Sequence, residues 1–212
     1  PAFSTWQMAA ESLQQEYEVQ RVDLSSGVVP SNIDVLVVIA PQEFTEKEYY
    51  TIDQYLMRGG SVVLAGGSYK LALDQMNATI AAQHIPDGIQ DLTAHYGITV
   101  TDKMVLDPQN EPFPLPQTRN VGGMQVQDFA TIDYPFFVDV RSDGMADGHP
   151  MVSNLSAVTL NWVSPLEISE AQHEDHDLTV VLESTEDSWM QGLSNIQPNF
   201  DMYPEYGFEI DE

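Results

Sequence analysis

Asp34-Val-Leu-Val-Val-Ile-Ala-Pro41 and Ser61-Val-Val-Leu-Ala-Gly-Gly67 frame the segment that decides the predicted fold. Val35 to Ala40 is a continuous apolar run, which is typical of a strand covered on both faces. Ser61 to Ala65 is a second apolar run of strand length. We therefore expect two buried strands, with a connection between them that is long enough to hold a helix.

The residues between the two runs carry the start and stop signals of that helix. Thr45 is placed to cap it, and Glu48 completes a capping box. Phe44 and Tyr49 occupy the positions of a hydrophobic staple, and Gly59 supplies the left-handed residue that ends many helices. Two buried strands joined by a helix run parallel with a right-handed crossover. The segment thus predicts a β-α-β unit and an α/β fold.

Weaker patterns on both sides of this unit predict the remaining elements. Apolar residues at helical spacing predict helices over residues 4–17, 68–83 and 89–96, and Ser4 with Gln7 forms a second capping box at the first of them. Alternation and short apolar runs predict strands over residues 17–24, 98–100, 104–106, 124–129, 136–140, 157–163 and 178–183. The sum is a three-layer, mostly parallel sheet with a β-rich C-terminal portion.

The chain is expected to form a single α/β domain over residues 1–190. Within it, residues 108–123 are predicted as a long loop, because Pro108, Pro112, Pro114 and Pro116 exclude a helix or a central strand. Such a loop is either functional or a surface excursion that packs on the domain. Residues 191–212 are acidic with scattered aromatic rings, and they are predicted as an extended tail.

The charge of the chain excludes several classes of partner. Seven basic residues face 33 acidic ones, which gives a formal net charge of −26. Nucleic acids and anionic membrane surfaces bind proteins of the opposite sign, so neither is an expected partner. The acidity indicates either a surface adapted to high salt, which fits the presence of only three lysines (Lys47, Lys70 and Lys103), or a solubilising surface. Cation capture is disfavoured because the acidic residues are spread along the whole chain.

The cysteine content and the length of the apolar runs narrow the possible functions further. The chain has no cysteine, which removes thiol catalysis, cysteine-based zinc sites and disulfides. No apolar run approaches the ~20 residues that span a bilayer, and the start does not read as a signal peptide. We expect a soluble chain, or an excised piece of a larger protein.

The turn Ala65-Gly66-Gly67-Ser68 is the first candidate for chemistry, because it joins a predicted strand to a predicted helix. It lacks the glycine pattern of a dinucleotide or phosphate loop. It is also not a nucleophile elbow, since Lys70 stands where that motif needs glycine. Open α/β sheets nevertheless bind ligands at the carboxyl ends of their strands. We therefore predict a ligand site there, formed by Pro41, Gln42, Glu43, Gly66, Gly67 and Ser68.

Other candidate sites are less specific. His173-Glu-Asp-His-Asp177 contains possible metal ligands, namely His173, Asp175 and His176. The two histidines are three residues apart rather than four, so a solvated acidic loop is preferred to a metal site. Carboxylate pairs carry no signal in so acidic a chain. Aromatic residues of the β-rich segments could line a sugar-binding surface, but such residues more often belong to the hydrophobic core, which is the preferred interpretation. They are Tyr134, Phe136, Phe137, Trp162 and Trp189.

Several motifs in order resemble the GldG-like auxiliary components of ABC-type transport systems. The most specific is Thr51-Ile-Asp-Gln-Tyr-Leu-Met-Arg-Gly-Gly60. The others are Tyr17-Glu-Val-Gln-Arg-Val-Asp-Leu-Ser-Ser-Gly27, Asp34 to Pro41, Tyr96-Gly-Ile-Thr-Val100, Tyr134-Pro-Phe-Phe-Val138, His149-Pro150, Ser164-Pro-Leu166 and Leu182-Glu-Ser-Thr-x-x-Ser-Trp189. The chain departs from these relatives at Ala65-Gly66-Gly67-Ser68, where they tend to have an aspartate-proline ending.

The resemblance implies a flavodoxin-like or glutamine-amidotransferase-like α/β domain outside the cytoplasmic membrane. Transmembrane helices outside this sequence would anchor it, and its partners would be the permease and ATPase subunits of an ABC transporter. The family offers no catalytic motif to carry over and no cofactor. We therefore expect a non-enzymatic module that binds a partner protein or a small ligand such as carbohydrate. The alternatives are a degenerate hydrolase or amidotransferase-like enzyme, and a metal-binding regulatory domain through residues 173–177.

Overall fold

The computed structural model describes residues 6–74, 79–85, 89–169, 177–192 and 196–198. The chain divides into two compact units. Unit 1 comprises Pro1–Val38 and Phe44–Leu64, and unit 2 comprises Ile39–Glu43 and Ala65–Glu212. Among the described residues, no helix combines the length and the apolar character needed to cross a bilayer.

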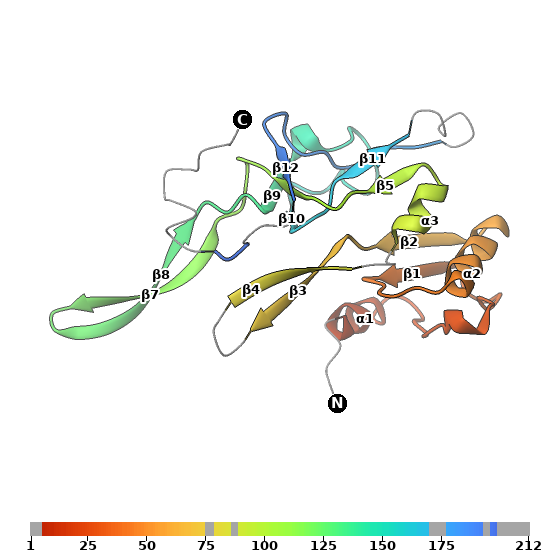
Figure 1. The fold of residues 1–212 in the computed structure, drawn as a ribbon, viewed down its shortest axis with the longest axis horizontal. Coiled ribbons are helices and arrows are strands. Elements are labelled where there is room, and N and C mark those ends of the chain that lie inside the picture. Colours follow the sequence, from red (N-terminus) through yellow and green to blue (C-terminus); the bar gives the residue numbers. More distant parts are fainter. Residues whose placement is uncertain (1–5, 75–78, 86–88, 170–176, 193–195, 199–212) are drawn as a thin grey trace. The chain divides into compact units, whose positions relative to one another are not determined.

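The predicted strand-helix-strand segment is present and belongs mainly to unit 1. Strand β1 (Val35–Ile39) is followed by helix α2 (Glu46–Met57) and strand β2 (Ser61–Ala65). The two strands pair, and Figure 1 draws their arrows in the same direction. The capping box of Thr45 and Glu48 is formed in both directions. The rings of Phe44 and Tyr49 meet edge to face at 5.5 Å, as the staple predicts.

Helix α2 is held against the chain that precedes β1 by side-chain hydrogen bonds. The Tyr55 hydroxyl donates to the carbonyl of Ile33 at 2.9 Å, and the buried Thr51 hydroxyl lies 3.1 Å from the carbonyl of Leu24. The backbone of Gly59 is left-handed, with φ of 85°, so the helix ends at the predicted place. These contacts fix the most specific of the resembling motifs in space.

Other predictions for unit 1 were wrong. Strand β1 is not covered on both faces, because Leu36 and Val38 are buried while Val35 and Val37 are exposed. Residues 17–24 form no strand, and a short 3-10 helix, η1 (Leu24–Ser26), ends the stretch. Helix α1 (Gln7–Leu13) is shorter than predicted and buries none of its residues. The predicted cap Ser4 lies outside the described residues.

Unit 2 is built from antiparallel strand pairs. The pairs are β3 (Tyr69–Asp74) with β4 (Thr79–His84), β5 (Ile98–Val100) with β11 (Leu166–Ile168), β6 (Met104–Leu106) with β12 (Trp189–Gln191), β7 (Phe113–Val121) with β8 (Met124–Ile132), and β9 (Phe137–Arg141) with β10 (Ala157–Asn161). The described part of unit 2 also contains helix α3 (Gln90–His95) and the 3-10 helix η2 (Ser142–Gly144).

This architecture overturns the predicted fold class. A three-layer, mostly parallel flavodoxin-like or glutamine-amidotransferase-like sheet is wrong, since the described strands form small, separate, mostly antiparallel sheets. The helix expected over residues 68–83 is instead the β3–β4 hairpin. Leu71, Ala72 and Ile80 fit a helical spacing, but in the hairpin Ile80 and Ala82 alternate with exposed neighbours, which is the period of a strand.

The loop expected over residues 108–123 also contains a strand. Strand β7 runs through two of its prolines and pairs with β8 in a nine-residue ladder, drawn as a long ribbon in Figure 1. Proline is compatible with a strand that has a free edge, because it cannot donate to a further neighbour. Pro114 and Pro116 therefore exclude a central strand but not this one.

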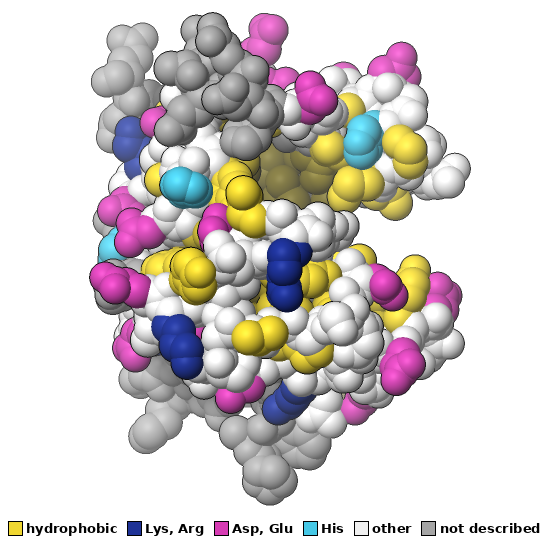
Figure 2. Space-filling model, turned by 90° about the vertical axis from the view of Figure 1, so that its right-hand side faces the viewer, with side chains coloured by type: hydrophobic (Ala, Val, Ile, Leu, Met, Phe, Trp, Pro, Cys, Tyr) yellow, Lys and Arg dark blue, Asp and Glu magenta, His cyan; other side chains and the backbone are white. Residues whose placement is uncertain are grey.

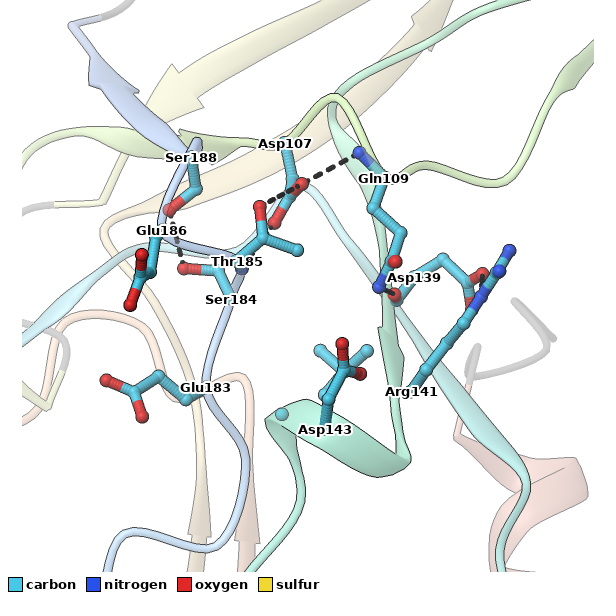
Figure 3. Close-up of a pocket in the computed structure, with 12 residues that line it drawn as sticks. Asp107, Gln109, Asp139, Arg141, Asp143, Glu183, Ser184, Thr185, Glu186 and Ser188 are labelled. Atoms are coloured by element: carbon cyan, nitrogen blue, oxygen red, sulfur yellow. Dashed lines mark hydrogen bonds and ion pairs between the residues drawn. The ribbon is translucent and has the colours of Figure 1, made fainter.

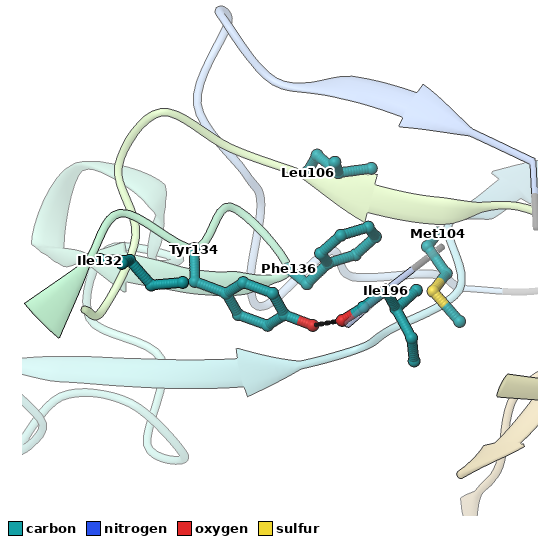
Figure 4. Close-up of a cluster of buried hydrophobic side chains, with 6 residues drawn as sticks. All are labelled: Met104, Leu106, Ile132, Tyr134, Phe136 and Ile196. Atoms are coloured by element: carbon teal, nitrogen blue, oxygen red, sulfur yellow. Dashed lines mark hydrogen bonds between the residues drawn. The ribbon is translucent and has the colours of Figure 1, made fainter. Parts of the chain in front are cut away.

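The core of unit 2 is aromatic and lies where the sequence placed it. Tyr134 and Phe136 are fully buried with Met104, Leu106, Ile132 and Ile196, as Figure 4 shows. The Tyr134 hydroxyl accepts a hydrogen bond from the Trp162 indole at 2.9 Å and donates one to the carbonyl of Ile196. A buried tyrosine whose hydroxyl both donates and accepts a hydrogen bond is a stable core residue. The preference for core over a sugar-binding surface is confirmed for these rings.

Candidate functional site

The predicted ligand residues at the carboxyl end of β1 lie in a strained loop. Ala40 and Glu43 have left-handed φ values of 45° and 54°, which non-glycine residues adopt at a cost of roughly 1–3 kcal/mol. Gln42 and Glu43 are exposed, whereas Pro41 is buried. The Gln42 side-chain oxygen accepts a hydrogen bond from Lys70 Nζ at 3.3 Å. The loop thus offers an exposed amide and an exposed carboxylate to a ligand.

The glycine turn after β2 serves packing. A Cβ added to Gly66 would lie 3.1 Å from Ile89 and 3.4 Å from Pro41, and one added to Gly67 would lie 3.3 Å from the Ser164 hydroxyl. Larger residues would push these neighbours apart. The fold therefore brings Gly66 and Pro41 together, and a side chain at Gly66 would be tight chiefly against Ile89.

Ser68 is buried and fully engaged in structural hydrogen bonds. Its hydroxyl donates to the carbonyl of Thr101 at 2.9 Å and accepts from the Gln90 amide at 3.3 Å, while its N–H donates to the Ser164 hydroxyl at 3.0 Å. A hydroxyl that donates to a backbone carbonyl is not poised as a nucleophile. Ser68 holds four segments of unit 2 together rather than facing a ligand.

The histidines do not assemble a described metal or catalytic cluster. The ring of His84 lies 2.9 Å from the Asp102 carboxylate, and both side chains are largely exposed. His149 accepts the N–H of Met151 through Nδ1 at 3.4 Å. Within the described ranges, no group of three or more histidine, aspartate or glutamate side chains is arranged to hold a metal ion. The candidate ligands His173, Asp175 and His176 lie outside those ranges.

A cavity of about 500 Å³ in unit 2 was not predicted from the sequence. It lies where β6 ends, beside β9 and η2, and the segment 183–188 closes its other side (Figure 3). Five carboxylates and one guanidinium line it together with hydroxyl and amide groups. The lining residues are Asp107, Gln109, Asp139, Val140, Arg141, Asp143, Gly144, Glu183, Ser184, Thr185, Glu186 and Ser188.

Asp107 fastens segment 183–188 to the body of unit 2. This carboxylate has no exposed surface, and it accepts three hydrogen bonds of 2.8 Å each. Two go to Oδ1, from the Gln109 N–H and the Thr185 hydroxyl, and one goes to Oδ2 from the Thr185 N–H. Figure 3 shows the threonine side chain turned toward the carboxylate. Three donors compensate the burial of an ionised group.

A second fastening lies at Gly144. A Cβ at this position would come within 2.4 Å of the Glu183 carbonyl, so only glycine permits the approach. The Glu183 N–H donates to the Gly144 carbonyl at 2.8 Å, and Met145 forms a β-bridge with Leu182. The strand predicted over residues 178–183 is thus reduced to an isolated bridge, which nevertheless sets one wall of the cavity.

Asp139 supplies the second buried carboxylate of the cavity. Its Oδ2 accepts the Arg141 Nε–H at 2.8 Å, and the neighbouring Gln109 amide donates to its backbone carbonyl at 2.7 Å. Asp143, Glu183 and Glu186 are exposed. The lining thus presents mainly acceptor groups, which suit a hydroxylated or cationic ligand.

Sequence reasoning missed this cavity because its parts are far apart in the chain. Asp107 and Thr185 are 78 residues apart, and no local spacing links them. Two signals were available. An aspartate follows directly on the predicted strand 104–106, and Thr185 stands inside the motif Leu182 to Trp189 that supports the family resemblance. Neither signal is specific without the fold.

The acidic residues form no dominant patch on the face shown in Figure 2. Acidic side chains are scattered there among hydrophobic and polar ones, with basic side chains between them. A dispersed surface of this kind raises the net charge without creating a focused cation site. The charge on this face is therefore dispersed rather than focused.

Comparison with known proteins assigns the family. The model of the ABC-type uncharacterized transport system family matches residues 2–206. An uncharacterized protein of Borreliella burgdorferi is 24% identical over 188 residues, which cover 86% of this chain and 35% of that protein. The chain thus spans about a third of the length of this curated relative. No solved structure matches this chain. Because the family model covers almost the entire sequence, the chain belongs to the ABC-type uncharacterized transport system family.

Proposed function

We propose that this chain is a non-catalytic binding module, outside the cytoplasmic membrane, of an ABC-type transport complex. The observation that carries the proposal is the family match over residues 2–206. The module would bind the permease of the complex and, through it, associate with the ATPase subunits. Its membrane attachment would come from segments of the full-length protein outside residues 1–212.

The side chains at the candidate sites support binding rather than catalysis. The Ser68 hydroxyl and the Asp107 carboxylate both make structural hydrogen bonds. A general base needs a free lone pair directed at the reacting proton, and three acceptor sites of Asp107 are taken by Thr185 and Gln109. The exposed loop Gln42–Glu43 and the acceptor-lined cavity of unit 2 favour a small polar ligand, such as carbohydrate, as a second occupant.

Co-purification from a membrane extract tests the partner. The full-length protein is expressed with the permease and ATPase subunits of its own transport system, with an affinity tag on the permease. We expect the full-length protein to be retained, and a form that lacks residues 6–198 to be lost. Equal retention of both forms would contradict the proposal, because the interaction would then not depend on this module.

Cysteine labelling tests the location. The module has no cysteine, and Met57 on α2 is exposed, so Met57→Cys adds a single accessible thiol to it. A membrane-impermeant maleimide should label the variant in intact cells as strongly as in lysed cells, with the parent protein as background. Labelling only after lysis would place the module in the cytoplasm and overturn the proposal.

Thermal shift and calorimetry decide between the small ligands. The purified module is titrated with neutral sugars, inorganic anions, zinc and calcium. A rise in the unfolding midpoint with a sugar supports the carbohydrate proposal. Tight zinc or calcium binding would favour a metal-binding regulatory domain instead.

A further inference from the structure

The β7–β8 hairpin, which we call the arm (residues 113–132), is exposed for most of its length. It is a two-stranded sheet with nine residue pairs, from Phe113 opposite Ile132 to Val121 opposite Met124. Phe113, Leu115 and Ile132 anchor its base in the core. Residues 124–129 of β8 are all exposed. An isolated two-stranded hairpin is marginally stable in water, so the outer part of the arm gains from being covered.

Apolar side chains are exposed on both faces of the arm. Met124 is 71%, Val126 45% and Phe129 70% exposed. Side chains alternate along a strand, so Met124 and Val126 share one face while Phe129, opposite Pro116, lies on the other. Exposed methionine and phenylalanine side chains on one element are typical of protein-contact surfaces. The contact would therefore involve both faces.

The edges of the arm disfavour simple strand addition. Pro114 and Pro116 in β7 have no N–H to give to a further strand. In β8, the Phe129 N–H is already bonded to the Asp128 carboxylate at 2.9 Å. These features weaken the edges for strand addition, so the apolar side chains are the groups better suited to make an interface.

The charges of the arm cancel each other, so the net charge of the whole chain indicates what kind of partner covers it. The arm holds one of the 33 acidic residues and one of the seven basic residues of the chain. These two, Arg119 and Asp128, pair with each other at 3.6 Å. A second copy of the chain would bring another net charge of −26, which opposes association. A partner with a net positive charge is attracted instead.

We propose that the arm, through Met124, Val126 and Phe129, docks on an apolar segment of net positive charge in a partner protein. This inference rests on the proposed function, in which the module binds the permease of its transport system, and it assigns the surface used. The apolar side chains supply the buried contact, and the negative field of the chain selects a basic partner over another copy of itself.

Site-specific photo-crosslinking tests the assignment in the full-length protein. A benzophenone amino acid replaces Phe129 on the arm or, as a control, the exposed Met57 on α2. We expect a product with the permease subunit from position 129 and none from position 57. A product between two copies of the chain, equal products from both positions, or no product from position 129 would each overturn the inference.

Substitution at the same surface provides the second test. The double variant Met124→Gln, Phe129→Gln should reduce the amount of protein retained by the tagged permease by about tenfold or more. The control is Met151→Gln, an equally exposed methionine of unit 2, which should keep full retention. Circular dichroism confirms that each variant is folded. Full retention of the double variant overturns this inference and leaves the proposed function standing, whereas no retention of the parent protein overturns both.

Discussion

A single buried carboxylate, Asp107, organises the wall of the unit 2 cavity. It receives a side-chain and a backbone hydrogen bond from Thr185 and a backbone hydrogen bond from Gln109. Hydrogen bonds to a charged group contribute roughly 1.5–3 kcal/mol each, and donors left unpaired carry a penalty of about 1–3 kcal/mol. Asp107 should therefore matter more to stability than any acidic residue on the cavity rim.

Replacement of Asp107 by alanine should lower the free energy of unfolding by about 3 kcal/mol or more, because three donors lose their acceptor. Thr185→Val removes only the hydroxyl donor and should cost about 1 kcal/mol. Urea unfolding followed by tryptophan fluorescence measures both effects, since Trp162 and Trp189 lie in unit 2. The control Asp143→Ala alters an exposed carboxylate and should stay within about 0.5 kcal/mol of the parent. An equal effect of Asp107→Ala and Asp143→Ala would contradict the assigned role.

Asp23 shows how an exposed carboxylate is tuned locally. The hydroxyl and the N–H of Ser25 both donate hydrogen bonds to the Asp23 carboxylate. These bonds, the one from the hydroxyl most of all, hold the pKa of Asp23 below its ordinary value of 3.8. A lowered pKa stabilises the folded chain at all pH values above the ordinary one. That contribution is lost as the pH falls through the lowered pKa.

Ser25→Ala should therefore raise the pKa of Asp23 toward its ordinary value, because it removes the hydroxyl donor but keeps the N–H. Carboxyl carbon chemical shifts, recorded in an NMR titration from neutral to acid pH, measure the change. Ser26→Ala is the matched control, since the Ser26 hydroxyl donates to the backbone carbonyl of Asp23 at 2.7 Å and not to its carboxylate. The same pKa in both variants would show that Ser25 is not the cause.

At the scale of the element, helix α2 was predictable because its signals are local. The Thr45 hydroxyl accepts the Glu48 N–H, and the Glu48 carboxylate accepts the Thr45 N–H at 2.8 Å. Both partners lie within four residues of sequence, so their spacing alone specifies the contact. Short-range chemistry of this kind fixed the start of the helix, its staple and its glycine end.

Thr45→Ala should destabilise unit 1 by about 1 kcal/mol, since capping residues contribute roughly 0.5–2 kcal/mol. Thr45→Ser keeps the hydroxyl and should restore most of the loss. Far-ultraviolet circular dichroism during urea unfolding reports the helix directly. If serine and alanine destabilise equally, the hydrogen bond from Glu48 is not the source of the stability.

The β3–β4 hairpin was not predictable in the same way, because long-range contacts decide it. The Ile80 N–H donates to the Gln197 side chain at 2.6 Å, 117 residues away. The N–H of Ile85 donates to the carbonyl of Ser68 at 2.8 Å. The apolar residues of this stretch fit a helix and a strand about equally, so tertiary packing makes the choice.

At the scale of the whole molecule, the error in fold class arose because the correctly predicted β-α-β segment was taken as typical of the entire chain. A parallel β-α-β segment is common in layered α/β proteins, and its presence led to the expectation of a parallel sheet throughout. Unit 2 instead closes short antiparallel pairs around Tyr134 and Phe136. The aromatic residues of the core were identified from the sequence. The pairing of the strands of unit 2 was not, because it is set by contacts that no local pattern encodes.

Net charge is the property of the whole chain that sequence alone defines, and it predicts a dependence on salt. With a net charge of −26, the folded chain repels itself more than the expanded one. The Debye length falls from about 30 Å at 0.01 M salt to about 3 Å at 1 M, which screens this repulsion. We expect the midpoint of thermal unfolding at pH 7 to rise by several degrees between these two concentrations of sodium chloride.

The same titration separates the two explanations of the acidity. A chain adapted to high salt should be unfolded by circular dichroism at 0.01 M, whereas a solubilising surface should leave it folded there. The control is a repeat near pH 4.1, the isoelectric point of the sequence, where little net charge remains to be screened and the gain should shrink. An equal gain at both pH values would show that sodium chloride acts through the apolar surface and not through the charge.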